Sequence, residues 1–149
     1  MHMRFFLFLK VKLLFAICSL LFVYVPVNKC FAQELRTITN RTVGTIDSDG
    51  KIRNTSNAII ARIDGDGKIR DNCNNVVARI ESDGTIKSNS NGTLGKVDSD
   101  GRVRDSGNHV IGKIDDDGKV RKNNSVVGTA YGVKREWAAI WFFFSNLLE

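Results

Sequence analysis

Acidic side chains recur in one short pattern, and they are the first residues in this chain with an obvious chemical potential. The segment Asp47-Ser48-Asp49-Gly50 has the order Asp-x-Asp-Gly that occurs in a calcium-binding loop. Such a loop has a further Asp two residues earlier, where this chain has Thr45. In the later copies that position is basic: Arg62, Arg79, Lys96 and Lys113. A basic residue at this position opposes the binding of calcium. A calcium-dependent module is therefore only an alternative to the main interpretation.

Cys73 and His109 are the other side chains that could take part in catalysis. Cys73 stands where other copies have Ser56, Ser90, Gly107 and Asn124, and His109 stands where they have Ala58, Asn75 and Gly92. Both positions are therefore tolerant turn positions, with no nucleophile, base and orienting acid standing out beside them. The sequence predicts no catalytic residues, no metal ligands and no cofactor, and hence a protein that is not an enzyme.

A basic column accompanies the acidic one through the chain. It consists of Arg53, Arg70, Lys87, Arg104 and Arg121, beside Asp47, Asp64, Glu81, Asp98 and Asp115. A basic ring could hold an anionic polysaccharide, whereas cross-strand pairing with the acidic column explains the same pattern without a ligand. We favour pairing and keep an anionic-polysaccharide-binding surface as the alternative.

Residues 1–32 have the layout of a secretory signal peptide. Arg4, Lys10 and Lys12 precede an almost wholly apolar stretch, and the segment ends with small side chains suited to cleavage before Gln33. We expect export to the periplasm, cell surface or extracellular space, with no membrane span after removal of the signal. An uncleaved anchor and a lipoprotein at Cys30 are weaker readings of the same residues.

Loss of this segment changes the charge argument. Four of the 22 basic residues and none of the 16 acidic ones lie in it, so 18 basic face 16 acidic residues in the remainder. Basic and acidic residues also alternate closely instead of forming a block. The pattern gives no support to nucleic acid binding. Cys73 is the one cysteine outside the signal, so no internal disulfide is possible after cleavage.

The remaining chain, residues 33–149, is predicted to be one β-hairpin repeat domain. Five copies of a 17-residue unit follow one another without interruption. Their boundaries are 44–60, 61–77, 78–94, 95–111 and 112–128. Half of a further unit precedes the first copy, and half follows the last after a one-residue deletion in the fifth copy. Two half units suit a closed ring with a seam, and they would equally cap an open stack.

Each copy is predicted to contain short strands and two kinds of turn. Apolar residues alternate with polar ones, as in Arg62-Ile63-Asp64, which indicates strands with one buried face. Asp-Gly pairs such as Asp66-Gly67 favour a tight hairpin turn, and Asn residues such as Asn74 favour a second turn. By the same alternation, Ile59 should share a face with Ala61 and Ile60 should point the opposite way. The predicted fold class is all-β with pseudo-five-fold symmetry, and an open β-solenoid is the alternative.

One column of every copy is never larger than Ala. It consists of Gly44, Ala61, Ala78, Gly95 and Gly112. A small residue at the same place in each repeat suggests backbones that converge near a rotational axis.

The aromatic tail, residues 133–149, departs from the repeat. It contains Trp137, Trp141 and three successive phenylalanines, too few apolar residues for a helix to span a bilayer. We expect a strand, either in the core or at a subunit interface, because aromatic residues favour strands. Self-association through this tail is therefore a possible partner interaction.

The repeat pattern followed by this tail resembles the 5-fold β-flower proteins over roughly residues 35–144. The resemblance implies β-hairpins arranged as petals around an axis, with possible assembly into a homo-oligomer, and it implies no catalytic residues. The sequence as a whole predicts an exported, non-catalytic protein with a structural role, or with a binding role toward protein or glycan. The ligand and the subunit number do not follow from it.

Overall fold

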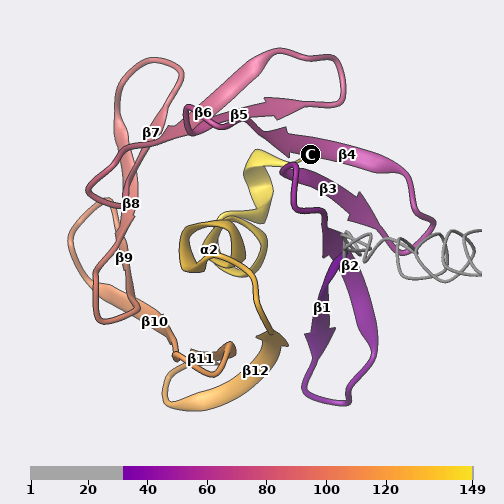
Figure 1. Cartoon of the computed structure of the whole chain (residues 1–149). Coiled ribbons are helices and arrows are strands. Elements are labelled where there is room, and N and C mark those ends of the chain that lie inside the picture. Colours follow the sequence, from indigo (N-terminus) through magenta and orange to yellow (C-terminus); the bar gives the residue numbers. More distant parts are fainter. Residues whose placement is uncertain (1–31, 149) are drawn as a thin grey trace, which may run out of the picture.

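The computed structural model describes residues 32–148, and these form a closed antiparallel barrel around one helix (Figure 1). The predicted signal peptide lies outside the described residues apart from Ala32. Neighbouring strands in the sequence are neighbours in the barrel throughout, and β1 closes the ring by pairing with β12. Closure decides between the two topologies suggested by the repeat, because an open solenoid would leave two free edges.

Twelve strands of four to six residues make the wall of the barrel in this part of the chain. They are β1 (Gln33–Thr37), β2 (Thr42–Ile46), β3 (Lys51–Asn54), β4 (Ile59–Ile63), β5 (Lys68–Asp71), β6 (Val76–Ile80), β7 (Thr85–Ser88), β8 (Thr93–Val97), β9 (Arg102–Asp105), β10 (Val110–Ile114), β11 (Lys119–Lys122) and β12 (Ser125–Ala130). Helix α2 (Arg135–Phe143) and the short 3₁₀ helix η1 (Ser145–Leu147) follow.

The two kinds of turn lie at opposite ends of the barrel, because the strands are antiparallel and the turns alternate. One end, here called the Asp-Gly end, carries five Asp-Gly turns. Each of these turns connects an even-numbered strand, from β2 to β10, to the odd-numbered strand that follows it. The opposite end, here called the Asn end, carries the turns within six strand pairs from β1–β2 to β11–β12. The half units at the two ends of the repeat meet at the seam, where Leu35 pairs with Ala130.

Positive φ angles occur where the sequence predicts them. Asn57, Asn74, Asn91 and Asn108 have φ between 62° and 69°. Among the Asp-Gly turns, Gly67 has a φ of +84°, and its carbonyl oxygen accepts a hydrogen bond from the Ile80 amide at 2.9 Å. The turn thus joins one repeat to the next through the main chain as well as reversing the chain direction.

A β-bulge in each strand pair of the Asn end alters the faces expected from strict alternation. In β3–β4, Ile52 pairs with Ala61 and Arg53 pairs with Ile59, which leaves Ile60 as an extra residue. Ile60 packs against the core, whereas Ile59 is exposed. The alternation prediction for these two residues was wrong, since a bulge adds one residue and moves the inward face by one position. The same extra position in the other pairs is taken by Val43, Val77, Leu94, Ile111 and Val127.

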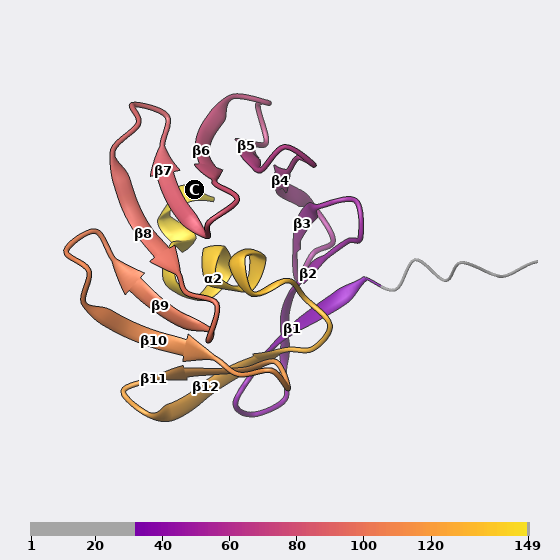
Figure 2. The same ribbon diagram turned by 60° about the vertical axis from the view of Figure 1, so that its left-hand side comes forward.

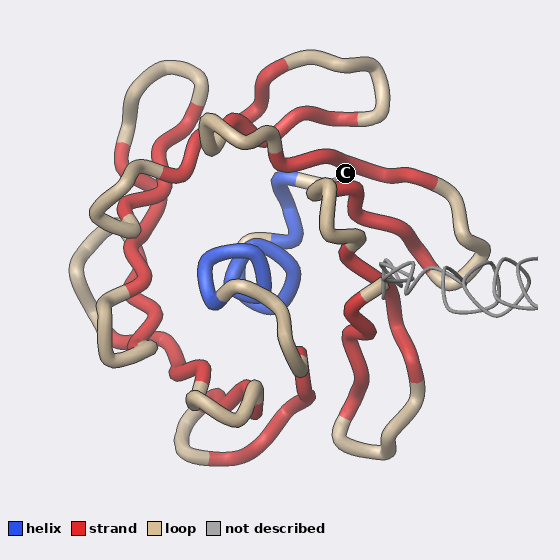
Figure 3. The backbone as a smooth tube through the Cα atoms, viewed as in Figure 1, coloured by secondary structure: helices blue, strands red, loops and turns tan. Residues whose placement is uncertain are grey.

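The aromatic tail forms α2 inside the barrel and not the strand that its composition predicts (Figures 2 and 3). A closed ring offers no free edge for a further strand, and a helix satisfies its own backbone hydrogen bonds. Ala138, Ala139 and Ile140 are fully buried and belong to the same apolar cluster as the inward residues of the strands. The tail is therefore core, as one of the two expected roles required, but in a different conformation.

The small-residue column makes room for the aromatic side chains of α2. A Cβ atom on Gly44 would lie 2.6 Å from Cη2 of Trp141, and one on Gly112 would lie 2.3 Å from Cε1 of Phe143. Such a Cβ on Gly44 would also lie 2.7 Å from the carbonyl oxygen of Arg53 on the neighbouring strand. The expected crowding is present, but its main partner is the helix, which the repeat pattern alone does not reveal.

No helix within residues 32–148 has the length and the apolar character needed to cross a membrane.

Candidate functional site

The Asp-Gly end of the barrel is the candidate functional site, because two pockets open there between the turns and the start of α2. The chain leaves β12, crosses this end through residues 131–134 and enters the barrel as α2 (Figure 2). Residues of this crossing and of the first helical turn line both pockets.

The first pocket has a volume of about 370 Å³ and lies between two successive Asp-Gly turns. Its lining includes Asp64 and Glu81 from the turns and Glu136 and Trp137 from α2. The ammonium of Lys134 lies over the indole of Trp137, 4.8 Å from the ring centroid. A half-buried aromatic ring is thus surrounded by carboxylates and a cation at the surface.

The second pocket, of about 440 Å³, lies beside the seam of the barrel. Arg135 joins two turns at its border: it donates to the Ser99 carbonyl oxygen at 2.8 Å and forms an ion pair with Asp116. Tyr131 stands between two lining residues, Ala130 and Gly132, and 57% of its surface is exposed. This part of the Asp-Gly end therefore also carries an aromatic side chain open to solvent.

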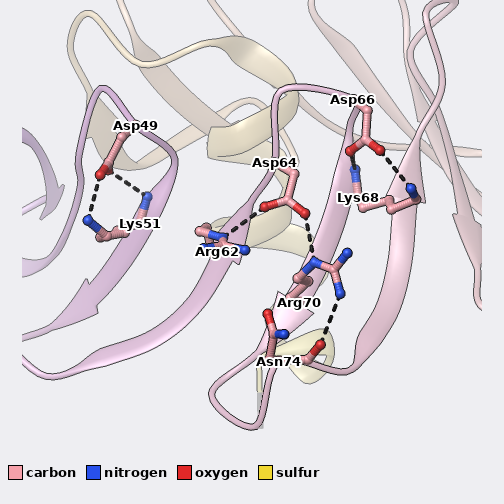
Figure 4. A network of polar contacts seen from close by, with 8 residues as sticks. All are labelled: Asp49, Lys51, Arg62, Asp64, Asp66, Lys68, Arg70 and Asn74. Carbon is pink, nitrogen blue, oxygen red and sulfur yellow. Dashed lines mark hydrogen bonds and ion pairs between the residues drawn. The ribbon is translucent and has the colours of Figure 1, made fainter.

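Ion pairs orient the side chain of Asp64, one of the residues that line the first pocket (Figure 4). Asp64 accepts from Nε of Arg70 at 2.7 Å and from Nε of Arg62 at 2.8 Å. Arg70 also donates to the carbonyl oxygen of Asn74 at 3.0 Å, so its guanidinium connects the turns that precede and follow β5. The hydrogen bond from Arg70 to Asp64 is the main reason that the pKa of Asp64 lies below the usual value. Pairing of the acidic and basic columns, the interpretation favoured from the sequence, is confirmed in each copy, at 2.6–2.9 Å for the arginines and 3.7 Å for Lys87.

The aspartate of each Asp-Gly pair stabilises its own turn. Asp66 accepts from the Lys68 backbone amide at 3.3 Å and from its ammonium at 2.7 Å. In the third copy the cation is replaced by Thr85, whose backbone amide and hydroxyl both donate to Asp83, at 3.0 and 2.9 Å. These two donors, the amide first, lower the pKa of Asp83 to about 2. The recurring aspartates are therefore engaged within the fold.

Comparison with known proteins identifies a family that shares this repeat sequence. A model of the family described as 5-fold beta-flower protein matches residues 32–146. The chain belongs to the 5-fold β-flower family. No curated protein and no solved structure matched it. The five-fold character of this β-flower protein lies in its five 17-residue repeats, while the joined half units add the strands that complete the ring.

The side chains singled out from the sequence lie apart from one another in the β-flower protein. Cys73 is exposed in the turn after β5, and its backbone amide donates to Asp71 at 2.9 Å. His109 lies in the turn after β9, where Nδ1 is 3.4 Å from Asp105 Oδ2. Within residues 32–148, no three His, Cys, Asp or Glu side chains come together as metal ligands would. Calcium dependence and self-association through the tail both stay predictions.

Sequence reasoning missed Lys134 as a site residue, and it named Trp137 in the aromatic tail without placing it at the Asp-Gly end. Both belong to the tail, and its interpretation as a strand gave no reason to place them next to the Asp-Gly turns. The available signal was the run Arg135 to Ile140, which contains two alanines and reads equally well as a helix.

The carboxylates of the Asp-Gly end predict a loss of stability in acid. Asp49, Asp64, Asp66, Asp83 and Asp117 all have pKa values below the ordinary 3.8 in the folded protein. Their stabilising effect is complete above about pH 5, where the unfolded chain is also ionised, and it is lost as the pH falls through the folded-state values. We expect the melting temperature, followed by circular dichroism, to fall between about pH 5 and pH 2.

The same prediction can be checked at one residue. Carbon-13 NMR of the Asp83 carboxyl should titrate near pH 2, in line with its pKa of about 2. Thr85→Val should raise this pKa while leaving it below 3.8, because the backbone amide remains as a donor. A midpoint near 3.8 in the unmodified protein would contradict the prediction.

Proposed function

We propose that this protein is an exported, non-catalytic binding module that recognises a carbohydrate at the Asp-Gly end of the barrel. The observation that carries the proposal is the first pocket, where Trp137 stands among paired carboxylates and cations on a rigid rim. Carbohydrates offer apolar faces with hydroxyl groups around them, and this combination of an aromatic ring with acceptors and donors complements both.

The interior of the barrel is filled, so a ligand can bind only on the outer surface. Side chains of α2 fill the centre of the ring, and Ala138, Ala139 and Ile140 are fully buried there. An eight-stranded or larger barrel that binds small molecules inside needs an empty lumen. A ligand of this protein therefore meets turns, strand edges and the crossing to α2.

The polar groups of the first pocket are suited to hydroxyl recognition. Carboxylate oxygens of Glu81 and Glu136 can accept, and the ammonium of Lys134 can donate. Glu81 pairs with Arg79 at 2.7 Å and with Lys87 at 3.7 Å, so its charge is already compensated before a ligand arrives. A neutral polyol then encounters ordered hydrogen-bonding groups instead of a bare charge.

Export is supported by the position at which the fold begins. Strand β1 starts at Gln33, the residue that follows the predicted cleavage site, and Leu35 is already fully buried. Removal of residues 1–32 would then leave the barrel intact. Mass spectrometry of the protein recovered from the exported fraction should give a chain that begins at Gln33, and a chain that retains Met1 would contradict export with cleavage.

Tryptophan fluorescence tests the binding proposal, because the chain has two tryptophans in different surroundings. Trp137 lines the first pocket, whereas Trp141 packs toward Gly44 of β2. A neutral oligosaccharide selected from a glycan array should shift the emission of the unmodified protein and of Trp141→Phe. It should leave the emission of Trp137→Phe unchanged.

Two results would argue against the proposal. One is an array on which no carbohydrate binds above background. The other is an oligosaccharide whose binding is unaffected by Trp137→Phe and by Tyr131→Ala, since this would place recognition outside the Asp-Gly end. Binding of a protein in place of a glycan would contradict the carbohydrate assignment in the same way.

A further inference from the structure

A third pocket lies on the outer wall of the barrel, away from the Asp-Gly end, and three cations line it. It has a volume of about 210 Å³, and Arg102, Lys113 and Arg121 contribute their side chains from β9, β10 and β11. Arg102 pairs with Lys113 across β9–β10, and Lys113 pairs with Arg121 across β10–β11. Like charges directly opposite one another destabilise a sheet. A similar row of cations runs through Lys51, Arg62 and Arg70.

The carboxylates around the third pocket compensate part of this charge. Arg102 lies 3.1 Å from Asp100. Asp115 is shared, at 2.6 Å from Arg121 and 3.6 Å from Lys113. Three cations therefore have two acidic partners, which leaves one positive charge over at the pocket.

Arg121 differs from the matching arginines of the other copies because its turn is shorter. The fifth copy lacks one residue here, and its turn consists of Asn123 and Asn124, both with positive φ (48° and 63°). The hydrogen bond from Arg121 to the turn carbonyl is 3.4 Å long, compared with 3.1 Å for Arg53 and 3.0 Å for Arg104.

The side chain of Arg121 is also more exposed than the matching arginine side chains. Arg121 is 36% exposed, whereas Arg53, Arg70 and Arg104 are each 24% exposed. Their guanidinium groups have two good acceptors, the acidic column and the turn carbonyl. Arg121 keeps its carboxylate but has a weak second acceptor, so N–H donors are left for a ligand in the pocket.

The geometry points to an anion-binding site at this place, where the shortened turn leaves Arg121 more exposed than the matching arginines of the other copies. We infer that Arg102, Lys113 and Arg121 bind a tetrahedral oxyanion, sulfate or phosphate, carried by an acidic polysaccharide. A guanidinium with free donors suits such oxyanions, and two flanking cations add charge attraction. The pocket volume of about 210 Å³ is several times the roughly 30 Å³ that one water occupies in the liquid. The pocket therefore has room for the oxyanion and for adjoining sugar atoms.

Binding of dextran sulfate to the protein, with unsulfated dextran as the reference polymer, tests this site. By calorimetry, dextran sulfate should bind with an affinity that falls as salt rises, and unsulfated dextran should not compete at this site. Arg121→Gln should weaken binding of dextran sulfate at least about ten-fold, which corresponds to the loss of one strong charge-assisted contact.

Arg53→Gln is the matched control, because Arg53 occupies the same column and makes the same two contacts, but it lies opposite Thr45 instead of a lysine and is less exposed. It should leave the affinity unchanged. Lys113→Thr is a second variant that the fold should tolerate, since Thr45 occupies this position in the first copy. It should weaken binding as Arg121→Gln does.

Three results would overturn the inference. Equal effects of Arg53→Gln and Arg121→Gln would show general attraction to a basic surface. Undiminished binding by both Arg121→Gln and Lys113→Thr would place the anion elsewhere. Inorganic sulfate that binds as tightly as dextran sulfate would contradict a polysaccharide as the source of the oxyanion. Trp137→Phe should not change any of these affinities, so the outcome is independent of the carbohydrate proposal for the Asp-Gly end.

Discussion

Replacing Ile140 by Ala is expected to lower the free energy of unfolding by about 2–5 kcal/mol, the range for truncating a fully buried aliphatic side chain. Ile140 lies on α2 with no exposed surface and belongs to the cluster formed by the inward residues of the barrel. The ring around it is closed by main-chain hydrogen bonds, so the wall has little freedom to collapse into the space left behind. Urea denaturation followed by circular dichroism measures the change.

Ile38 provides the matched control for this prediction. It lies in the turn after β1 with 69% of its surface exposed, so Ile38→Ala should change the stability by less than about 0.5 kcal/mol. Removal of residues 134–149 is expected to abolish the cooperative transition altogether, because the barrel then has no filled centre. A truncated chain that remains a cooperatively folded monomer would contradict the role of α2 as core.

Gly67→Ala is expected to destabilise the protein by at least about 2 kcal/mol, because it combines an unfavourable φ with a collision. Gly67 has a φ of +84°, and a Cβ atom there would lie 2.2 Å from the carbonyl oxygen of Ile80. Relief of this contact requires the turn to move away from β6, which disturbs the hydrogen bond from the Ile80 amide to Gly67. Thermal denaturation should show a lower melting temperature.

Gly65, two residues earlier in the same turn, is the natural comparison. A Cβ atom at Gly65 would have no atom within 4 Å, and its φ lies outside the positive range. Gly65→Ala should therefore be neutral or slightly stabilising, by up to about 1 kcal/mol, through a smaller entropy of the unfolded chain. Similar melting temperatures for the two variants would contradict the strained geometry assigned to Gly67.

Local chemistry made the wall of the barrel predictable from the sequence. The 17-residue period, the Asp-Gly pairs and the recurrent Asn positions specified strands and turns, because each depends on a few adjacent residues and their allowed φ angles. The pairing of the acidic and basic columns followed for the same reason, since Asp64 directly follows β4 and Arg70 lies on β5, six residues later in the same hairpin. Each of these residue patterns recurs in successive copies, and this recurrence distinguishes it from a chance similarity.

The faces of the strands near the Asn end were not predictable in this way. A bulge at Ile60 changes the inward position without leaving a distinctive residue in the sequence, and Ile59, Ile60 and Ala61 all look apolar or small. Its presence depends on how two strands pair, which is a tertiary property.

The repeat, its antiparallel strands and its two kinds of turn follow from the sequence alone, which also predicts an export signal before them. That residues 135–143 form a helix depends on the closed barrel, because ring closure removes the free edge that a further strand would need. That one outcome also explains the small residues Gly44 and Gly112, which face aromatic rings of α2, and it brings Trp137 to the Asp-Gly end. Local pattern could not supply these contacts, since each joins residues that are distant along the chain.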